Sequence, residues 1–195
     1  MSRFKAFSLM ACLCFSAAAY ADDGSDTAFY LEAGVGHESV SYNSYSQDPV
    51  NQGVINGTGT ALSLVGGYGF NQNFALEVGY HDYGSPTTGR QSELSVSLCP
   101  TAFACPHISA FTIEAVGRFL ILPDLTGEVL GGVQAWNIGS PGNTVIGKTS
   151  GDSLIYGLRV RHDLHDRFEG WSVDVTYEYS AFSTSETRIG LRYSF

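Results

Sequence analysis

Hydrophobic and polar residues alternate with a period of two along most of the chain, and few segments show the period that predicts a helix. In "FALEVGYHDY", residues 74–83, large apolar side chains alternate with small or charged ones. Eight segments share this pattern, at about 28–37, 60–70, 74–83, 107–119, 125–136, 152–164, 171–180 and 186–195. The pattern therefore predicts an all-β protein with eight antiparallel strands.

The connections between these segments alternate in length. Those at about 71–73, 120–124 and 165–170 are short, and the last, 180–185, is brief. The others are long and rich in Ser, Asn, Gly, Thr and Pro, as solvated loops are, at about 38–59, 84–106 and 137–151. Tight turns on one side and long loops on the other are typical of a transmembrane β-barrel with periplasmic turns and extracellular loops.

The polar face of the strands indicates which side of such a barrel points outward. A soluble eight-stranded barrel would bury its apolar face instead. Here the polar face is rich in glycine, which suits a narrow interior, and its charges nearly balance, as buried charges must. We predict an interior charge network of Glu32, Glu77, Glu114, Glu128, Asp174 and Glu178 with Arg118, Arg159, Arg161, Arg188 and Arg192.

Two further features favour lipid on the outside. After residue 21 the only lysine is Lys148, whereas the arginine side chain suits internal pairing with carboxylates. Aromatic residues fall at the strand ends and predict two interfacial girdles. We expect Phe70, Phe74, Phe119, Trp171 and Phe195 on the turn side, and Tyr80, Phe111 and Tyr179 on the loop side.

The first 21 residues have the anatomy of a secretory signal peptide. A basic start, "MSRFK", precedes an apolar stretch and the A-x-A site Ala19-Tyr20-Ala21. A lipoprotein signal ending at Cys12 is the alternative, but it needs an unusual Met10 and a stunted apolar core. We therefore expect residues 1–21 to be cleaved and 22–195 to form the barrel domain. No later apolar run approaches the roughly 20 residues of a membrane helix.

Charge and cysteine content narrow the partners of the exported chain. Without Arg3 and Lys5 there are 8 basic and 19 acidic residues, a net charge of −11, which argues against nucleic acid. The pair Cys99 and Cys105, in "CPTAFAC", predicts a disulfide in an oxidising compartment. Free thiols are the alternative, and a zinc site would need more ligands than His107 offers.

The sequence predicts neither a metal site nor a cofactor. The glycine-rich stretches lie within strands, without a following helix to hold a phosphate. The histidines at positions 37, 81, 107, 162 and 165 are scattered without metal-ligand spacing, and we expect His162 and His165, which lie near a turn, to be solvated rather than ligands.

Two motifs carry a family resemblance that covers essentially the whole of 22–195. "GGYGF" leading into "NQNFALEVGYHDY", and the terminal "RIGLRYSF", resemble the OmpA-like and OmpX/Ail-like outer-membrane barrels. The resemblance implies the outer membrane of a Gram-negative bacterium, with lipid and lipopolysaccharide around the barrel. We expect no peptidoglycan-binding domain after the barrel, so the resemblance does not imply the cell-wall anchoring of full-length OmpA. The ending resembles the signal for the outer-membrane assembly machinery, carried by Ile189, Leu191, Tyr193 and Phe195.

The sequence leaves three functions open. An eight-stranded barrel is just filled by its side chains, which favours a structural plug over a narrow pore. The long loops, including Ala102-Phe103, are suited to surface interaction with host or matrix molecules, or to envelope integrity. A lipid A deacylase or acyltransferase would use His107 and Ser109, on one face, but the nearest acid, Glu114, is on the opposite face. We expect a structural or surface-interaction role, not an enzyme.

Overall fold

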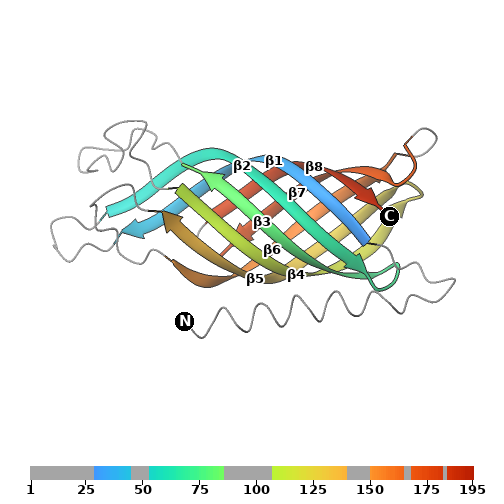
Figure 1. Cartoon of the computed structure of the whole chain (residues 1–195), viewed down its shortest axis with the longest axis horizontal. Coiled ribbons are helices and arrows are strands. Elements are labelled where there is room, and N and C mark those ends of the chain that lie inside the picture. Colours follow the sequence, from blue (N-terminus) through green and yellow to red (C-terminus); the bar gives the residue numbers. More distant parts are fainter. Residues whose placement is uncertain (1–28, 45–52, 86–106, 140–149, 165–167, 182–183) are drawn as a thin grey trace.

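The eight strands form one closed antiparallel barrel. The structure, a computed structural model, describes residues 29–44, 53–85, 107–139, 150–164, 168–181 and 184–195. Each strand pairs with its neighbours in sequence, and the last pairs with the first (Figure 1). The strands are β1 (Phe29–Ser44), β2 (Gly53–Gly69), β3 (Phe74–Gly84), β4 (His107–Leu122), β5 (Leu125–Gly139), β6 (Ser150–Asp163), β7 (Trp171–Ser180) and β8 (Thr184–Ser194). The predicted all-β, eight-stranded fold is confirmed.

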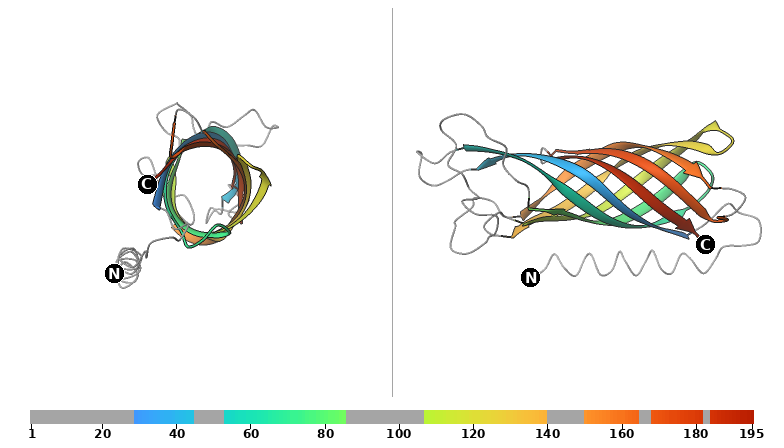
Figure 2. Two further views of the ribbon diagram at one scale, coloured as in Figure 1. Left: turned by 90° about the vertical axis from the view of Figure 1, so that its right-hand side faces the viewer. Right: turned by 90° about the horizontal axis from the view of Figure 1, so that it is seen from above.

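The strands cross the barrel at a tilt, and the view along its axis shows a closed ring (Figure 2). The short turns after β2, β4 and β6 lie at the same end as the start of β1 and the end of β8. We call this the turn end and the opposite one the loop end. Among the described residues, no helix is both long enough and apolar enough to cross a membrane.

The first hairpin is longer than the sequence pattern predicts. β1 and β2 stay paired from Phe29↔Tyr68 to Ser44↔Gly53, so most of the predicted loop 38–59 is strand. The alternation continues through this extension, because Glu38 and Val40 are buried whereas Ser39 and Ser41 are exposed. Its Ser, Asn and Gly content is typical of loops, which is why composition gave the wrong boundary.

The β4–β5 hairpin also extends further than predicted, because Leu122 pairs with Leu125 and leaves Pro123-Asp124 as the turn. At the β2–β3 turn, Asn71 Oδ1 accepts hydrogen bonds from the backbone N–H groups of Asn73 and Phe74, at 2.8 and 2.9 Å. Such a side-chain turn needs few residues, and it makes the connection between the strands tight.

The distribution of side chains is inverted relative to a soluble barrel. Leu31 and Leu64 on the outer face are 52 % and 58 % exposed, whereas Glu32 and Arg192 on the inner face are each 1 % exposed. Exposed apolar residues occur on the outer face of every strand, from Phe29 to Leu191. An apolar band of this extent around a polar interior is the arrangement of a barrel surrounded by lipid.

Aromatic rings collect at both ends of the outer face. At the turn end, Trp171 lies 5.1 Å from Tyr193, and Tyr193 lies 5.0 Å from Phe195, between ring centroids. At the loop end, the cross-strand partners Tyr80 and Phe111 are 5.0 Å apart. Both girdles therefore contain the predicted residues, and the structure adds Phe29, Tyr68, Tyr156 and Tyr193 to them.

Candidate functional site

The barrel interior holds most of the charged side chains that the structure describes. Eight acidic side chains are buried there, facing five arginines. The buried acids are Glu32, Glu38, Glu77, Glu114, Glu128, Asp174, Glu178 and Glu186. Two apolar clusters accompany them: Val40, Ala61, Tyr83, Ile108, Ala110, Trp136 and Ile138 toward the loop end, and Tyr30, Ala75, Val116 and Leu130 toward the turn end.

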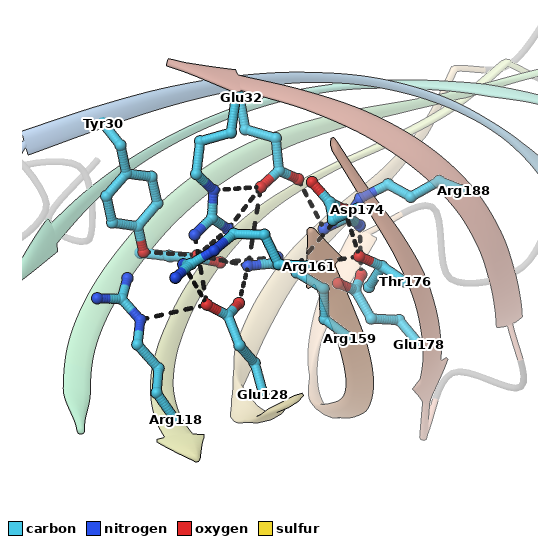
Figure 3. Close-up of polar contacts among 12 residues, drawn as sticks. Tyr30, Glu32, Arg118, Glu128, Arg159, Arg161, Asp174, Thr176, Glu178 and Arg188 are labelled. Carbon is cyan, nitrogen blue, oxygen red and sulfur yellow. Dashed lines mark hydrogen bonds and ion pairs between the residues drawn. The ribbon is translucent and has the colours of Figure 1, made fainter. Parts of the chain in front are cut away.

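Arg159, on β6, links the interior faces of four other strands (Figure 3). Its guanidinium donates two hydrogen bonds to Glu77, at 2.7 and 3.0 Å, in a bidentate pair. Nη1 also donates to Glu128 at 2.9 Å, and Nε donates to Thr176 Oγ1 at 3.0 Å. Bidentate arginine–carboxylate pairs fix geometry as well as charge, so Arg159 ties opposite walls of the barrel together.

Arg192 secures the seam where the barrel closes. It lies on β8, and its Nη2 donates to Glu32 Oε2 on β1 at 2.7 Å, across 160 residues of sequence. Its guanidinium carbon lies 4.1 Å from the centroid of the Tyr30 ring, in a cation–π contact. Tyr30 in turn donates its hydroxyl to Glu77 Oε1 at 2.7 Å, which joins the seam to the Arg159 pair.

Glu128 is the most surrounded carboxylate of the interior, with four arginines near it (Figure 3). Arg118 Nε lies 3.2 Å from Glu128 Oε1, and Arg161 Nη1 donates to the same oxygen at 2.8 Å. The turn-end half of the interior therefore contains four arginines with Glu32, Glu77, Glu128 and Asp174. Because these charges are desolvated, removal of one partner leaves another uncompensated.

The loop-end half has a different charge balance. Among the described residues its single arginine is Arg188, which donates to Glu178 Oε2 at 2.8 Å and lies 3.8 Å from Glu186. Glu114 faces the interior as predicted, but no hydrogen bond or ion pair joins it to an arginine among the described residues, and its Oε2 has no hydrogen-bond partner. Glu114 is therefore an interior acid without an arginine partner in the part of the chain that the structure describes.

Three interior residues are absent from the predicted network. Glu38 and Glu186 are buried cross-strand partners on β1 and β8. His81 is also buried, with Nδ1 3.2 Å from Glu186 Oε2, on the polar face of β3. The alternation carried the necessary signal, because Glu38 follows Gly36 and Glu186 precedes Arg188 by two positions on the polar face.

The residues of the enzyme hypothesis lie on the outer face near the loop end. His107 is exposed, and its Nε2 lies 3.2 Å from Asp82 Oδ1 on β3. Asp82 and Ser109 are cross-strand partners, whereas Glu114 points into the barrel. The acid near His107 is thus Asp82, which the sequence pattern did not single out.

The C-terminal strand lies against the start of β1. The backbone N–H of Phe195 donates to Phe29 O at 2.9 Å, and its ring is exposed in the turn-end girdle. Ile189 and Leu191 are exposed on the same outer face, and Tyr193 is partly exposed there. Residues 1–21 and the Cys99–Cys105 pair lie outside the described residues.

Comparison with solved structures supports the same architecture. Neisserial surface protein A aligns with a TM-score of 0.60 at 14 % identity, over 86 % of this chain and 97 % of that one. The N-terminal barrel of Pseudomonas aeruginosa OprF aligns with a TM-score of 0.57 at 13 % identity, over 89 % and 100 % of the two chains. At these identities the likeness shows the fold.

No curated protein sequence is significantly similar to the chain. The family model for the outer membrane protein beta-barrel domain, however, matches residues 7–195. The inverted distribution of side chains, the two aromatic girdles and this match all point to the outer membrane of a Gram-negative bacterium. The chain belongs to the family of outer-membrane proteins defined by that β-barrel domain.

Proposed function

We propose that the protein is a closed, non-conducting outer-membrane barrel, structural in its transmembrane part, which makes its external contacts at the loop end. The filled interior of the barrel supports this proposal. Arg159 joins Glu77 and Glu128 across the turn-end half, and Trp136, Tyr83 and Ile138 belong to a buried apolar cluster toward the loop end. Water and ions would have to pass both layers.

Opening either layer carries a free-energy cost. Displacing Arg159 would break its bidentate pair with Glu77 and its hydrogen bond to Glu128, and separating these buried charges would cost several kcal/mol. Displacing the apolar cluster would expose side chains such as Ile108 and Val40 to water. A pore would need both rearrangements at once, which favours the structural plug.

Planar-bilayer recording of the refolded protein tests this directly. We expect no stable conductance steps, while a porin inserted under the same conditions supplies the positive control. Reproducible discrete steps from the wild-type barrel would reject the plug and support the narrow pore. Heat-modifiable gel migration of the same sample would show that a protein without conductance steps is nevertheless folded.

The external contacts are proposed to lie in connections 45–52, 86–106 and 140–149, which leave the strands at the loop end. Recognition commonly resides in loops carried on a rigid scaffold, and these sequences are polar. The candidate partners are host or matrix molecules and lipopolysaccharide; the acidic composition disfavours nucleic acid. Cells with each connection replaced by a short Gly/Ser linker should lose host-cell or matrix binding. If all three loop-replacement variants reach the cell surface at equal levels and bind host cells and matrix as the wild type does, envelope integrity would remain as the role.

A second candidate, action on lipid A, is supported by the outward pair of Asp82 and His107. The 3.2 Å contact supplies an acid beside His107, and the backbone N–H of Gly84 donates to the same Oδ1 at 2.8 Å, which orients Asp82. Ser109 would be the nucleophile of such an enzyme. Lipid A mass spectra of cells carrying the wild type or Ser109→Ala decide it, because identical spectra would remove the enzyme hypothesis.

A further inference from the structure

Three metal-ligating side chains meet inside the loop-end half of the barrel. His81 on β3, Glu114 on β4 and Glu178 on β7 each offer a ligand atom, and these atoms lie within 4.8 Å of one another. All three residues are buried: His81 is fully buried, and Glu114 and Glu178 are 1 % and 2 % exposed. We propose that this group binds one divalent transition-metal cation of the zinc type.

The carboxylates of this site have lone pairs without partners. Glu114 Oε2 and Glu178 Oε1 are buried and make no hydrogen bond. The other oxygen of Glu178 accepts from Arg188 at 2.8 Å, which holds that carboxylate in place and leaves Oε1 available. A buried carboxylate oxygen without a partner is unfavourable, and a cation bound between Glu114 and Glu178 would satisfy both.

His81 has the hydrogen-bond arrangement of a metal ligand. Its Nδ1 lies 3.2 Å from Glu186 Oε2, and a ligating histidine usually donates its other N–H to a carboxylate in this way. The remaining nitrogen, Nε2, has only a long contact of 3.4 Å with Thr112 Oγ1. Nε2 is therefore free to bind a cation while Glu186 fixes the tautomer and the ring orientation.

Gly79 provides the space that this arrangement needs. A Cβ atom at position 79 would lie 2.9 Å from His81 Nε2 and 2.6 Å from Thr112 Oγ1. The absence of a side chain thus keeps the surroundings of the nitrogen open on the interior face of β3.

Electrostatics also favour a cation here. Glu38, Glu186 and Glu178 are consecutive cross-strand partners on β1, β8 and β7. Like charges directly opposite one another on paired strands are destabilising. The positive groups facing these acids and Glu114 are Arg188 and, when protonated, His81. One dication would offset most of the remaining negative charge.

The donor set selects the class of metal. One imidazole with two carboxylates suits Zn²⁺ and neighbouring transition metals, whereas Mg²⁺ and Ca²⁺ prefer oxygen ligands alone. Bonds of about 2.0–2.2 Å require the three ligand atoms, which lie within 4.8 Å of one another, to move closer together on binding. Three protein ligands would leave a fourth position for water.

Metal analysis of the full chain tests the proposal. The protein is refolded in detergent with Zn²⁺, freed of loose metal by gel filtration with a weak chelator, and analysed by mass spectrometry for metal per chain. We expect about one retained zinc, one being the stoichiometry of a single three-ligand site. His81→Gln and Glu114→Gln should each lower the retained zinc at least tenfold, whereas His162→Gln, on the outer surface, should leave it unchanged.

Three outcomes would overturn the proposal: no retained zinc in the wild type, undiminished zinc in His81→Gln, or loss of zinc in His162→Gln. The first would mean that protons rather than a metal neutralise the acids. Heat-modifiable migration confirms that each variant is folded. Co²⁺ loading of the wild type supplies a second readout, because a nitrogen ligand changes the visible absorption of the ion, and Glu114→Gln should alter that spectrum.

Discussion

Arg159 and Glu77 form a bidentate ion pair between β6 and β3, with N–O distances of 2.7 and 3.0 Å, although 82 residues separate them in sequence. Both side chains are buried, so neither charge has water as an alternative partner. Glu77 of this pair also accepts a hydrogen bond from the Tyr30 hydroxyl, at 2.7 Å. It therefore couples the first, third and sixth strands, and the stability of the barrel should depend on it.

Substitution of Arg159 by Met should lower the free energy of unfolding by about 3–5 kcal/mol, because the four buried acids of the turn-end half would then face only three arginines. The double variant Arg159→Met/Glu77→Leu should recover much of that loss, since no unpaired charge remains at the pair. Urea unfolding in lipid vesicles measures both. Equal stability of Arg159→Met and the wild type would contradict the importance of the pair.

Arginine on the outer face should be tolerated according to its depth in the membrane. Leu64→Arg, within the apolar band and away from the turn end, should cost about 2–4 kcal/mol, whereas Leu120→Arg, near the turn end, should cost about 0–1 kcal/mol. Both residues are exposed leucines, so the two variants are matched in chemistry. Equilibrium unfolding in vesicles gives the difference, and equal costs would argue against a lipid-facing band.

The neighbouring glycines Gly66 and Gly67 should respond differently to alanine. A Cβ at Gly67 would lie 2.0 Å from Tyr30 Cζ, whereas one at Gly66 would meet only Leu31 Cδ2, at 3.6 Å. Gly67→Ala should therefore destabilise the barrel by about 1–3 kcal/mol, as overpacking does. Gly66→Ala, on the outer face, should be close to neutral. A reversed order in thermal unfolding would mean that the inward and outward assignment of β2 is wrong.

The terminal phenylalanine should matter for assembly more than for stability. Its side chain is 73 % exposed, and its ring contact is with Tyr193 at 5.0 Å, so Phe195→Ala should change unfolding little. If the assembly machinery reads this residue, the amount of protein in the outer membrane should fall several-fold. Phe119→Ala, an exposed phenylalanine of the same girdle, is the control. Equal membrane levels for both variants would contradict the assembly signal.

Local alternation was enough to predict which side chains face inward, because a strand places successive residues on opposite faces whatever it pairs with. Glu77 and Arg159 could be assigned to the interior on that ground alone. Their partnership could not, since it depends on the relative stagger of β3 and β6 around the closed barrel. The link between His81 and Glu186, 105 residues apart, was missed for the same reason.

The predicted strand boundaries were wrong where the amino-acid composition of a segment and its alternation of side chains disagreed. Residues 38–44 and 53–59 contain the small polar residues of a loop, yet they pair over their full length. Glu38 was not included in the predicted interior network because the segment that begins at residue 38 was interpreted as a solvated loop. The alternation of Gly36, Glu38 and Val40 was the more reliable signal, since interior positions in this barrel accept charged, small and apolar side chains alike.

Gel migration combined with cell fractionation shows whether the protein is a closed barrel in the outer membrane. The unboiled protein should migrate differently from the boiled protein, because a barrel closed by the β1–β8 pairing resists detergent until heated. It should also be found in the outer-membrane fraction. Identical migration before and after boiling, with the protein in the soluble periplasm, would mean that the chain is not an outer-membrane barrel.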